Sequence, residues 1–181
     1  MAYKGQFTPK YPKKYIGDPS KITYRSMWER NVMKWLDEKA NVEEWGSEEL
    51  AIPYEHPIRG GRARYYPDFI IKFPDGTMKV VEIKPKKETV KPEKPSRQTK
   101  KYLNEVMTFA INSQKWEAAE EVCKKNGLIF EIWTEDTLAE MGILHTSPEN
   151  KKQVLREGRE KPKLKPVRKT RKTLPRPKRK S

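Results

Sequence analysis

The sequence predicts one α/β domain over residues 26–142, in which helices flank a mixed β-sheet. Two runs of β-forming residues surround a turn in the middle of the chain, which predicts a β-hairpin. Apolar residues at helical spacing lie on both sides of that hairpin. The predicted order is helix, three strands, helix, strand and helix, with an extended arm at 1–25 and a basic tail at 143–181.

The charge of the chain is unevenly distributed. The net charge is +15, but residues 151–181 hold 15 of the 40 basic residues and 2 of the 25 acidic ones, a net charge of +13. The remainder is nearly neutral, at +2. A segment so basic and so poor in apolar residues is expected to be disordered until it meets a partner such as nucleic acid. A solvated run of charge and a nuclear localisation signal are the alternative interpretations.

Cysteine content and hydropathy limit the location of the protein. The single cysteine, Cys123, excludes an internal disulfide and a cysteine-cluster zinc site, and it fits a reducing compartment. No apolar run approaches the ~20 residues of a membrane span, and the N-terminus has no signal-peptide core. We therefore expect no membrane partner and a location in the cytoplasm, or inside a particle assembled there.

The arm at residues 1–25 carries aromatic residues at a spacing of four, but its prolines and glycine break any helix there. Its rings and lysines suit base stacking and phosphate contact, and the rings equally suit packing onto the domain. The first helix is predicted from Ser26 to about Lys39. Its apolar stripe consists of Trp28, Val32, Trp35 and Leu36. Ser26 and Glu29 match a capping box, in which the Glu29 carboxylate accepts a hydrogen bond from the N-cap amide.

The segments on either side of the hairpin are more polar. Residues 41–47 are predicted as a connector, 50–55 as a strand and 56–61 as a turn. Residues 85–95 combine lysine, glutamate and proline, which predicts a solvated, mobile loop.

The last third of the domain returns to regular structure. A second helix is predicted over about 98–125, with a break near Asn112 as an alternative. Residues 128–133 predict a short strand, and Thr134 suits the N-cap of a last helix over 135–141.

The hairpin turns at a Pro-Asp-Gly sequence, residues 74–76, which predicts a type I turn followed by a glycine with positive φ. This three-residue loop fixes the register of the strands, because Phe73 then faces Thr77. A two-residue loop on Asp75 and Gly76 is the alternative, and it would put the two acidic side chains discussed next on opposite faces.

With the three-residue loop, Asp68 lies opposite Glu82 and Tyr66 lies opposite Lys84, all on one face. Directly opposed Cβ atoms are about 5 Å apart, so both carboxylates can reach one divalent cation. An ion pair of Lys84 with either acid is the alternative explanation for this polar cluster. The other face is predicted to be core and consists of Phe69, Ile71, Phe73, Val81 and Ile83.

The Pro-Asp at 67–68, followed after the hairpin by Glu-Ile-Lys at 82–84, matches the PD-(D/E)XK pattern of restriction-endonuclease-like nucleases. A helix with Glu29 precedes the pattern, and helix, strand and helix follow, in the order that this superfamily uses. Longer stretches resemble the head completion nucleases of T4-like tailed phages, which are similar to transposon-end endonucleases. These stretches are residues 24–29, 45–49, 52–54, 64–69 and 82–85. The resemblance covers roughly residues 1–142 and implies a restriction-endonuclease-like core.

The resemblance also implies a Mg²⁺ or Mn²⁺ site in which Asp68 and Glu82 bind the ion, with the backbone carbonyl of Ile83 as a third ligand. It implies that Lys84 orients or activates the attacking water. Glu29 would hold a second ion or a water bound to the first. Spacing alone makes Glu29 a helix cap, so its catalytic role depends on the resemblance.

Two sets of basic residues are candidates for contact with DNA. Lys115, on the second helix, is a candidate phosphate contact, although a solvated lysine is the favoured interpretation. The tail is predicted to be a non-specific anchor on duplex DNA, with strongly salt-dependent binding. Its candidate contacts are Lys161, Lys163, Lys165, Arg168, Lys169, Arg171 and Lys172.

The resemblance implies a metal-dependent DNA endonuclease of phage head completion, which processes packaged DNA near the portal before the tail attaches. The expected partners are double-stranded DNA and phage portal or neck proteins. The expected location is the host cytoplasm during assembly and then the virion. The alternatives are a non-catalytic head-closure protein that binds DNA and portal, and a resolvase of branched DNA. Oligomeric state and the form of the DNA substrate are not predicted.

Overall fold

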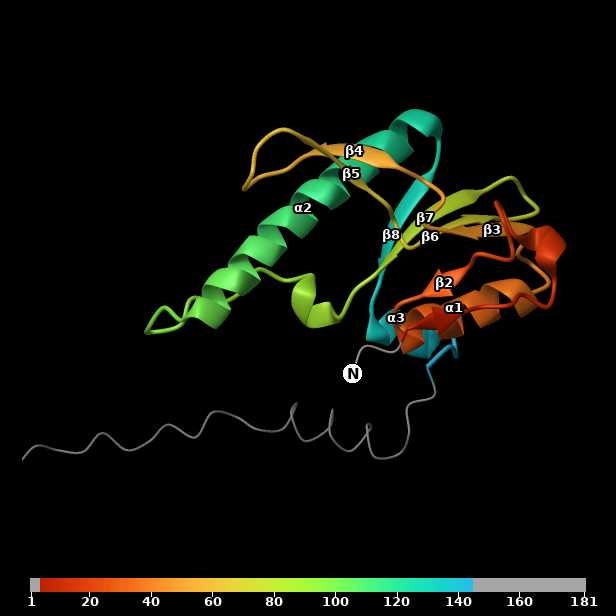
Figure 1. Ribbon diagram of the computed structural model, residues 1–181, viewed down its shortest axis with the longest axis horizontal. Helices are drawn as coiled ribbons and strands as arrows, with labels where there is room; N and C mark the ends of the chain where they lie inside the picture. The colour runs from red at the N-terminus through yellow and green to blue at the C-terminus, as the bar shows by residue number, and fades with distance from the viewer. Residues whose placement is uncertain (1–3, 145–181) are drawn as a thin grey trace, which may run out of the picture. The chain divides into compact units, whose positions relative to one another are not determined.

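Figure 1 shows the computed structural model, which describes residues 4–144. Its helices are α1 (Met27–Glu38), α2 (Lys100–Asn126) and α3 (Glu135–Glu140), with short 3₁₀ helices η1 (Pro12–Lys14) and η2 (Lys86–Glu88). Its strands are β1 (Gly5–Gln6), β2 (Thr23–Tyr24), β3 (Glu44–Ser47), β4 (Ile52–Glu55), β5 (Arg62–Tyr65), β6 (Phe69–Lys72), β7 (Met78–Ile83) and β8 (Ile129–Trp133). Over residues 4–144, no helix is long and apolar enough to cross a membrane.

The central sheet contains strands β3, β6, β7 and β8, in that order. The first three strands pair antiparallel, and β8 joins β7 in parallel. Successive side chains of a strand point to opposite faces, so each face packs against a different layer. Helices α1 and α3 cover one face and α2 covers the other (Figure 1). The prediction of a mixed sheet between helices is confirmed.

The hairpin of β6 and β7 has the predicted register, in which Phe69 faces Val81. The N–H of Phe73 donates to the carbonyl oxygen of Thr77 at 2.9 Å, and Gly76 has a φ of 83°. Glycine adopts this conformation without the steric cost of a side chain, so the turn sequence selects the three-residue loop.

The first strand of the hairpin is shorter than the sequence indicates. The run of β-forming residues begins at Tyr65, but β5 ends at that residue and β6 starts only at Phe69. Pro67 lies in the gap and has no N–H to donate to a sheet. The chain therefore changes sheets directly before Asp68.

The predicted pairing of Tyr66 with Lys84 is wrong, because β7 ends at Ile83. The N–H of Lys84 donates instead to the carbonyl oxygen of Trp133, in β8, at 3.1 Å. Tyr66 is 45% exposed and lies outside any strand. Lys84 thus continues the parallel pair of β7 and β8.

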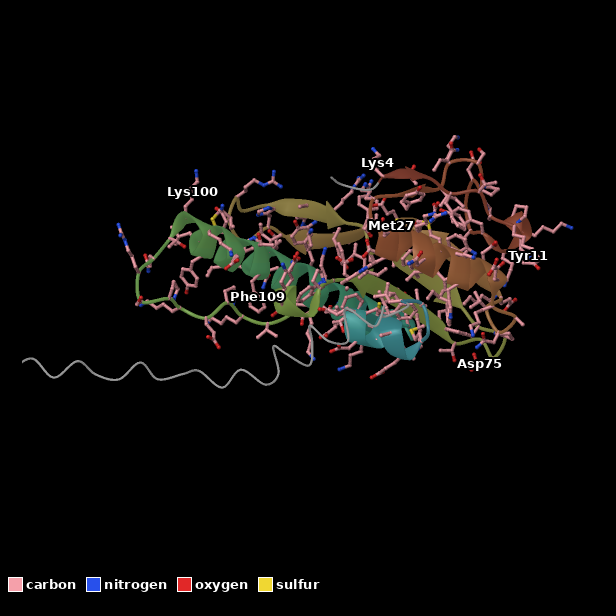
Figure 2. All side chains as sticks on the ribbon, turned by 90° about the horizontal axis from the view of Figure 1, so that it is seen from below. Lys4, Tyr11, Met27, Asp75, Lys100 and Phe109 are labelled. Carbon is pink, nitrogen blue, oxygen red and sulfur yellow. The ribbon has the colours of Figure 1, made fainter. Side chains whose placement is uncertain are left out.

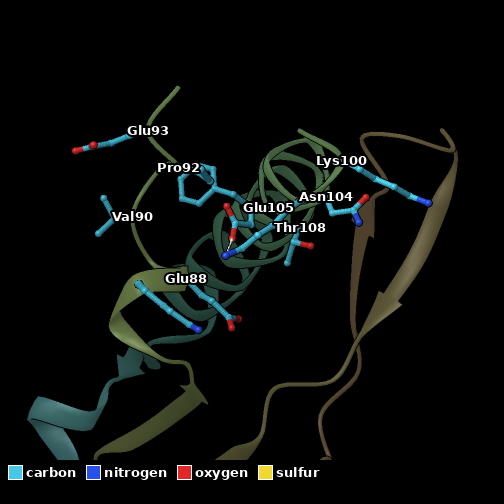
Figure 3. Close-up of a pocket in the computed structure, with 11 residues that line it drawn as sticks. Glu88, Val90, Pro92, Glu93, Lys100, Asn104, Glu105 and Thr108 are labelled. Carbon is cyan, nitrogen blue, oxygen red and sulfur yellow. Dashed lines mark ion pairs between the residues drawn. The ribbon is translucent and has the colours of Figure 1, made fainter. Parts of the chain in front are cut away.

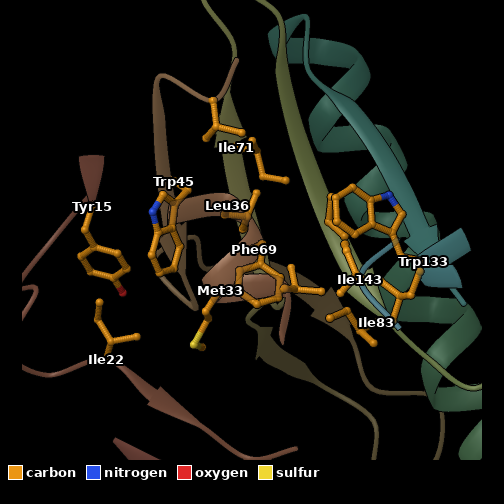
Figure 4. Packing of buried hydrophobic residues seen from close by; sticks show 14 residues of the cluster. Tyr15, Ile22, Met33, Leu36, Trp45, Phe69, Ile71, Ile83, Trp133 and Ile143 are labelled. Carbon is orange, nitrogen blue, oxygen red and sulfur yellow. The ribbon is translucent and has the colours of Figure 1, made fainter. Parts of the chain in front are cut away.

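The main core lies between one face of the sheet and helix α1 (Figure 4). The hairpin supplies Phe69, Ile71, Val81 and Ile83, and Phe73 packs at the edge. Helix α1 supplies Val32, Met33 and Leu36, each fully buried. Burial of one such side chain contributes about 1.5–3 kcal/mol, so this face fixes the hairpin against the helix. The predicted core face of the hairpin is confirmed.

Strands β4 and β5 form a separate two-stranded ribbon, residues 52–65, that packs on α2. The inner side chains of the ribbon and helix are Ile52, Tyr54, Tyr65 and Ala119. Arg62 and Arg64 alternate with these inner residues and are exposed. The ribbon is thus apolar toward α2 and charged toward solvent, where the Nε of Arg62 lies 3.7 Å from Oε1 of Glu55.

Helix α2 runs without a break through Asn112, so the alternative of an interrupted helix is wrong. Gly127, with a φ of 69°, ends the helix in the left-handed conformation that glycine commonly adopts after a helix. In Figure 2 the helix start at Lys100 lies at the opposite end from the hairpin turn at Asp75. The first half of α2 therefore extends beyond the sheet.

The arm packs onto the domain, as one of the two interpretations of its aromatic residues predicts. Tyr15 is 9% exposed, and its ring meets that of Trp45 edge to face with 4.8 Å between centroids. The ring centroid of Phe7 lies 6.0 Å from that of the same indole. The predicted connector that contains Trp45 is in fact strand β3, because residues 44–47 pair with β6.

The C-terminal elements agree with the sequence. Strand β8 lies within the predicted 128–133 segment, and Thr134 caps α3 in a capping box with Thr137. The loop at 85–95 contains the short helix η2, which the sequence does not indicate.

The arm is held by a buried carboxylate, which gives a testable prediction. Asp37 is 2% exposed and accepts hydrogen bonds from the backbone N–H groups of Lys10, at 2.7 Å, and Tyr11, at 3.2 Å. Asp37→Ala leaves these donors without their partner and is expected to lower the free energy of unfolding by about 2–4 kcal/mol. Thermal unfolding and limited proteolysis of the arm measure this. The neighbouring exposed Glu38→Ala is the control, and equal stability of the two variants would contradict the prediction.

Candidate active site

Glu82 lies near the end of β7 and Lys84 directly follows the strand, two residues on and therefore on the same side of the extended chain. The Nζ atom of Lys84 lies 3.3 Å from Oε1 of Glu82. Glu82 is 5% exposed, so this pair is more shielded from water than a surface ion pair. Burial lowers the pKa of Lys84, but the charges of Glu82 and Asp68 outweigh it, and the net shift is upward. The amine therefore stays charged.

Asp68 follows the buried Pro67 and accepts two hydrogen bonds, one from β7 and one from the residue after β3. Its Oδ2 accepts from the N–H of Ile83 at 2.7 Å, and its carbonyl oxygen accepts from the N–H of Glu48 at 3.3 Å. Burial and the charge of Glu82 together raise the pKa of Asp68 to about 8. The predicted meeting of Asp68 and Glu82 at the end of the hairpin is therefore present in the structure.

Two carboxylates with restricted access to water repel each other, and the one ammonium group of Lys84 does not neutralise both. A hard divalent cation fits this donor set, because Mg²⁺ is bound through one or two carboxylates and keeps several waters. Within residues 4–144, no group of three or more His, Cys, Asp or Glu side chains is placed to hold a metal ion. A cation here would depend on Asp68, Glu82 and a backbone oxygen such as that of Ile83.

Glu29 lies in the first turn of α1 and has a capping role in the structure. The Oγ of Ser26 accepts from the N–H of Glu29 at 3.1 Å, which confirms Ser26 as the N-cap. The Glu29 carboxylate accepts from the N–H of Arg25 at 2.7 Å, one residue before the N-cap amide that the capping box predicts. The charge of Glu29 also raises the pKa of Asp68, with a smaller effect than burial or the charge of Glu82. It is therefore near the site, and its catalytic role stays a prediction.

Arg25 and Glu48 are neighbours of the site to which the sequence assigns no chemistry. The Arg25 guanidinium forms an ion pair with the Glu48 carboxylate. Glu48 has a φ of 57°, which is left-handed and costly for a residue other than glycine. Because the N–H of Glu48 bonds to the carbonyl oxygen of Asp68, this conformation places the Arg25 ion pair next to the Asp68 segment.

Tyr65 is a site residue that sequence reasoning missed. It is 3% exposed, and its hydroxyl donates to Oε2 of Glu82 at 2.8 Å. Burial, and then the charge of Glu82, raise the pKa of Tyr65. The register of the hairpin could not reveal this contact, because Pro67 separates Tyr65 from the strand that pairs with β7. The only sequence signal is a tyrosine three residues before Asp68.

Lys115 lies on α2, half-buried against the ribbon. Its Nζ is 5.5 Å from the ring centroid of Tyr65 and 5.9 Å from that of Tyr54. The Lys115 ammonium group thus lies against two aromatic rings. It is not fully surrounded by water, and its position is not explained by DNA contact alone. The predicted tail contacts, from Lys161 to Lys172, lie outside the described residues.

A groove of about 700 Å³ lies away from the four predicted catalytic residues, between the loop at 85–95 and the first half of α2 (Figure 3). Glu88, Val90 and Pro92 form one wall and Asn104 and Thr108 the other. None of the residues that line it is Glu29, Asp68, Glu82 or Lys84. Asp68, Glu82 and Lys84 lie at or beside the ends of β6 and β7, and Glu29 lies in α1, so none of the four belongs to this groove.

Comparison with known proteins places the chain among nucleases. The family model described as "TnsA-like endonuclease N terminal" matches residues 39–135, which include both strands of the hairpin. The curated relative "Head completion nuclease" of Enterobacteria phage T4 is 44% identical over 147 residues. That alignment covers 79% of this chain and 98% of the phage T4 protein.

Proposed function

Because this chain belongs to the TnsA-like endonuclease family, a restriction-endonuclease-like family, we propose that it is a metal-dependent DNA endonuclease of phage head completion. The restriction-endonuclease-like fold that the resemblance implies is confirmed by this membership. The observation that carries the proposal is the meeting of Asp68, Glu82 and Lys84 at the end of the β6–β7 hairpin.

Asp68 and Glu82 would hold Mg²⁺ or Mn²⁺, with the carbonyl of Ile83 as a further ligand. A divalent cation bound there supplies a Lewis acid that neutralises charge on the scissile phosphate and acidifies water. The reaction is hydrolysis of a phosphodiester, in which a water oxygen bonds to phosphorus and the leaving sugar oxygen takes a proton. The protein supplies charged groups held in place with limited access to water, and such groups interact with the charge of the phosphate more strongly than they would in bulk water.

Lys84 complements the carboxylates because its ammonium group is charged and is held 3.3 Å from Glu82. Such a group orients the attacking water and stabilises negative charge that develops on the phosphate. Glu29, in the first turn of α1, would bind a second cation or a water molecule, as the resemblance implies. Its Oε2 accepts from the N–H of Arg25, and within residues 4–144 its Oε1 makes no hydrogen bond, so Oε1 would take that role.

The proposed biological setting is supported by the name of the phage T4 relative, a head completion nuclease whose length the chain covers almost fully. In this setting the protein processes packaged DNA near the portal before the tail attaches, with portal or neck proteins as partners. It works in the host cytoplasm during assembly and then remains in the virion. The basic tail would anchor the protein on duplex DNA.

Cleavage assays with the full chain test the proposed function. Linear duplex, supercoiled plasmid and four-way junctions are incubated with Mg²⁺, with Mn²⁺ or with EDTA. The proposal expects cleavage of at least one DNA form with either metal and none with EDTA. Absence of metal-dependent cleavage on every form would contradict it, and cleavage confined to junctions would favour a resolvase.

The outer face of the ribbon is a candidate contact for the DNA next to the site. Arg62 and Arg64 are exposed there, about 7 Å apart along one strand. Arg64 and Asp68 are four residues apart in the sequence, so the two arginines are close along the chain to the proposed catalytic carboxylates. A two-stranded ribbon fits the major groove, and guanidinium groups bind phosphates well.

The double variant Arg62→Ala/Arg64→Ala is expected to weaken duplex binding and reduce the log–log salt slope by about 1–2, because each phosphate contact contributes about 0.9. Fluorescence anisotropy at several salt concentrations, in EDTA, measures the slope. Lys124→Ala, an exposed residue near the far end of α2, is the control. An unchanged slope in the double variant would show that the ribbon does not contact DNA.

A further inference from the structure

The geometry points to Tyr65 as the residue that positions Glu82 for cation binding, a role that rests on the proposed function. Its hydroxyl donates to Oε2 of Glu82 at 2.8 Å, and both residues are at most 5% exposed. Tyr65 belongs to the ribbon and Glu82 to the central sheet. The bond therefore joins two sheets at the proposed active site.

The two oxygens of Glu82 have different partners. Oε2 accepts from Tyr65, and Oε1 lies 3.3 Å from the Nζ of Lys84. A carboxylate held at both oxygens does not rotate freely, so its orientation is set before any cation arrives. With Oε2 occupied by the phenol, Oε1 is the oxygen available on the side of Lys84. Tyr65 would thereby leave Glu82 one carboxylate oxygen, Oε1, with which to hold a cation.

Tyr65 is itself held in place by α2. Its ring packs in the apolar cluster with Ile52 and Ala119, and the Nζ of Lys115 lies 5.5 Å from its ring centroid. The same ammonium group lies 5.9 Å from the ring of Tyr54. Contacts of a cation with aromatic rings contribute about 0.5–2 kcal/mol when partly shielded from water. Lys115 therefore links α2 to the ribbon and limits the movement of the Tyr65 phenol.

A purely structural role for Tyr65 makes a different prediction. A buried carboxylate needs hydrogen-bond donors for stability alone, so removal of the Tyr65 hydroxyl could destabilise the fold without any effect on cation binding. Cation affinity distinguishes the two roles, because positioning changes the affinity of the folded protein and simple hydrogen-bond satisfaction does not. Tyr54 provides the matched comparison, since its ring meets the same lysine but its hydroxyl makes no hydrogen bond within residues 4–144.

The test measures Mn²⁺ binding by the metal-free full chain with isothermal titration calorimetry. Removal of a partner that orients a metal ligand typically costs about 10–100-fold in affinity, so Tyr65→Phe is expected to show this loss. Tyr54→Phe is expected to bind Mn²⁺ within about twofold of wild type. In DNA cleavage, the Mn²⁺ concentration for half-maximal rate should rise for Tyr65→Phe, with a smaller change in the rate at saturating Mn²⁺.

A second variant keeps the test decisive where Tyr65→Phe folds poorly. Lys115→Met removes a positive charge near the site, and by charge alone it would strengthen Mn²⁺ binding. The positioning role predicts the opposite, a loss of a few-fold, because the phenol is less firmly held.

Three outcomes would overturn the inference. Tyr65→Phe could fold and bind Mn²⁺ as tightly as wild type, Tyr54→Phe could lose as much affinity, or Lys115→Met could bind more tightly. If wild type binds Mn²⁺ and cleaves DNA in these cases, only the positioning role fails. If wild type neither binds Mn²⁺ nor cleaves DNA, the proposed function and the inference both fail.

Discussion

Replacement of Glu82 by glutamine is expected to reduce the rate of DNA cleavage by about 10³-fold or more, with little change in duplex binding. The amide removes the charge that would bind a divalent cation and breaks the ion pair with Lys84. It keeps a carbonyl oxygen that can still accept from the Tyr65 hydroxyl, so the fold is expected to survive. Single-turnover cleavage and duplex binding in EDTA, measured on the same preparation, separate chemistry from binding.

The control is another carboxylate paired with a lysine in the same sheet. Glu131, in β8, lies 2.6 Å from the Nζ of Lys79 and away from the proposed site. Glu131→Gln is expected to cleave DNA within about threefold of wild type, as most surface substitutions have small effects. Comparable losses in Glu82→Gln and Glu131→Gln would mean that sheet stability, and not catalysis, explains the effect.

Replacement of Asp68 by asparagine is expected to abolish cleavage and also to stabilise the metal-free protein. Burial and the charge of Glu82 raise the pKa of Asp68 to about 8, from an ordinary value of 3.8. The folded state thus binds a proton that the unfolded state releases, and the contribution of Asp68 to stability is lost as the pH rises toward 8. The asparagine cannot ionise, and its side-chain oxygen can still accept from the N–H of Ile83.

The expected gain of Asp68→Asn is small near pH 4 and largest above pH 8, about 1–3 kcal/mol after allowance for partial exposure. Thermal unfolding in EDTA at both pH values measures it, with about 2–4 °C expected for each kcal/mol. Asp75→Asn is the control on the same hairpin, because hydrogen bonds from Thr77 lower the pKa of Asp75. That variant should show no gain. A gain for Asp68→Asn that does not grow with pH would contradict the charge repulsion described here.

The part of the site that lies on the hairpin could be predicted from the sequence because its determinants are local. The Pro-Asp-Gly turn at 74–76 sets the loop length, and the loop length sets which residues face each other. This register by itself makes Asp68 and Glu82 neighbours. The prediction of the core face is correct for the same reason, since alternation along a strand decides which side chains are buried.

The features that sequence reasoning missed depend on contacts between distant segments. The sequence predicts a connector over residues 41–47, and only pairing with β6 makes residues 44–47 a strand. Tyr65 contacts Glu82 from another sheet, beyond a proline that ends the predicted register. The two interpretations of the arm are separated only by the packing of Tyr15 against Trp45.

Crystals of the full chain soaked in Mn²⁺ would decide whether Asp68 and Glu82 hold one divalent cation at the end of the hairpin. An anomalous difference map shows the ion independently of the protein atoms. We expect a peak about 2 Å from an oxygen of Asp68 and from Oε1 of Glu82. If the protein cleaves DNA with Mn²⁺ but the Mn²⁺ peak contacts neither carboxylate, these residues do not hold the catalytic ion.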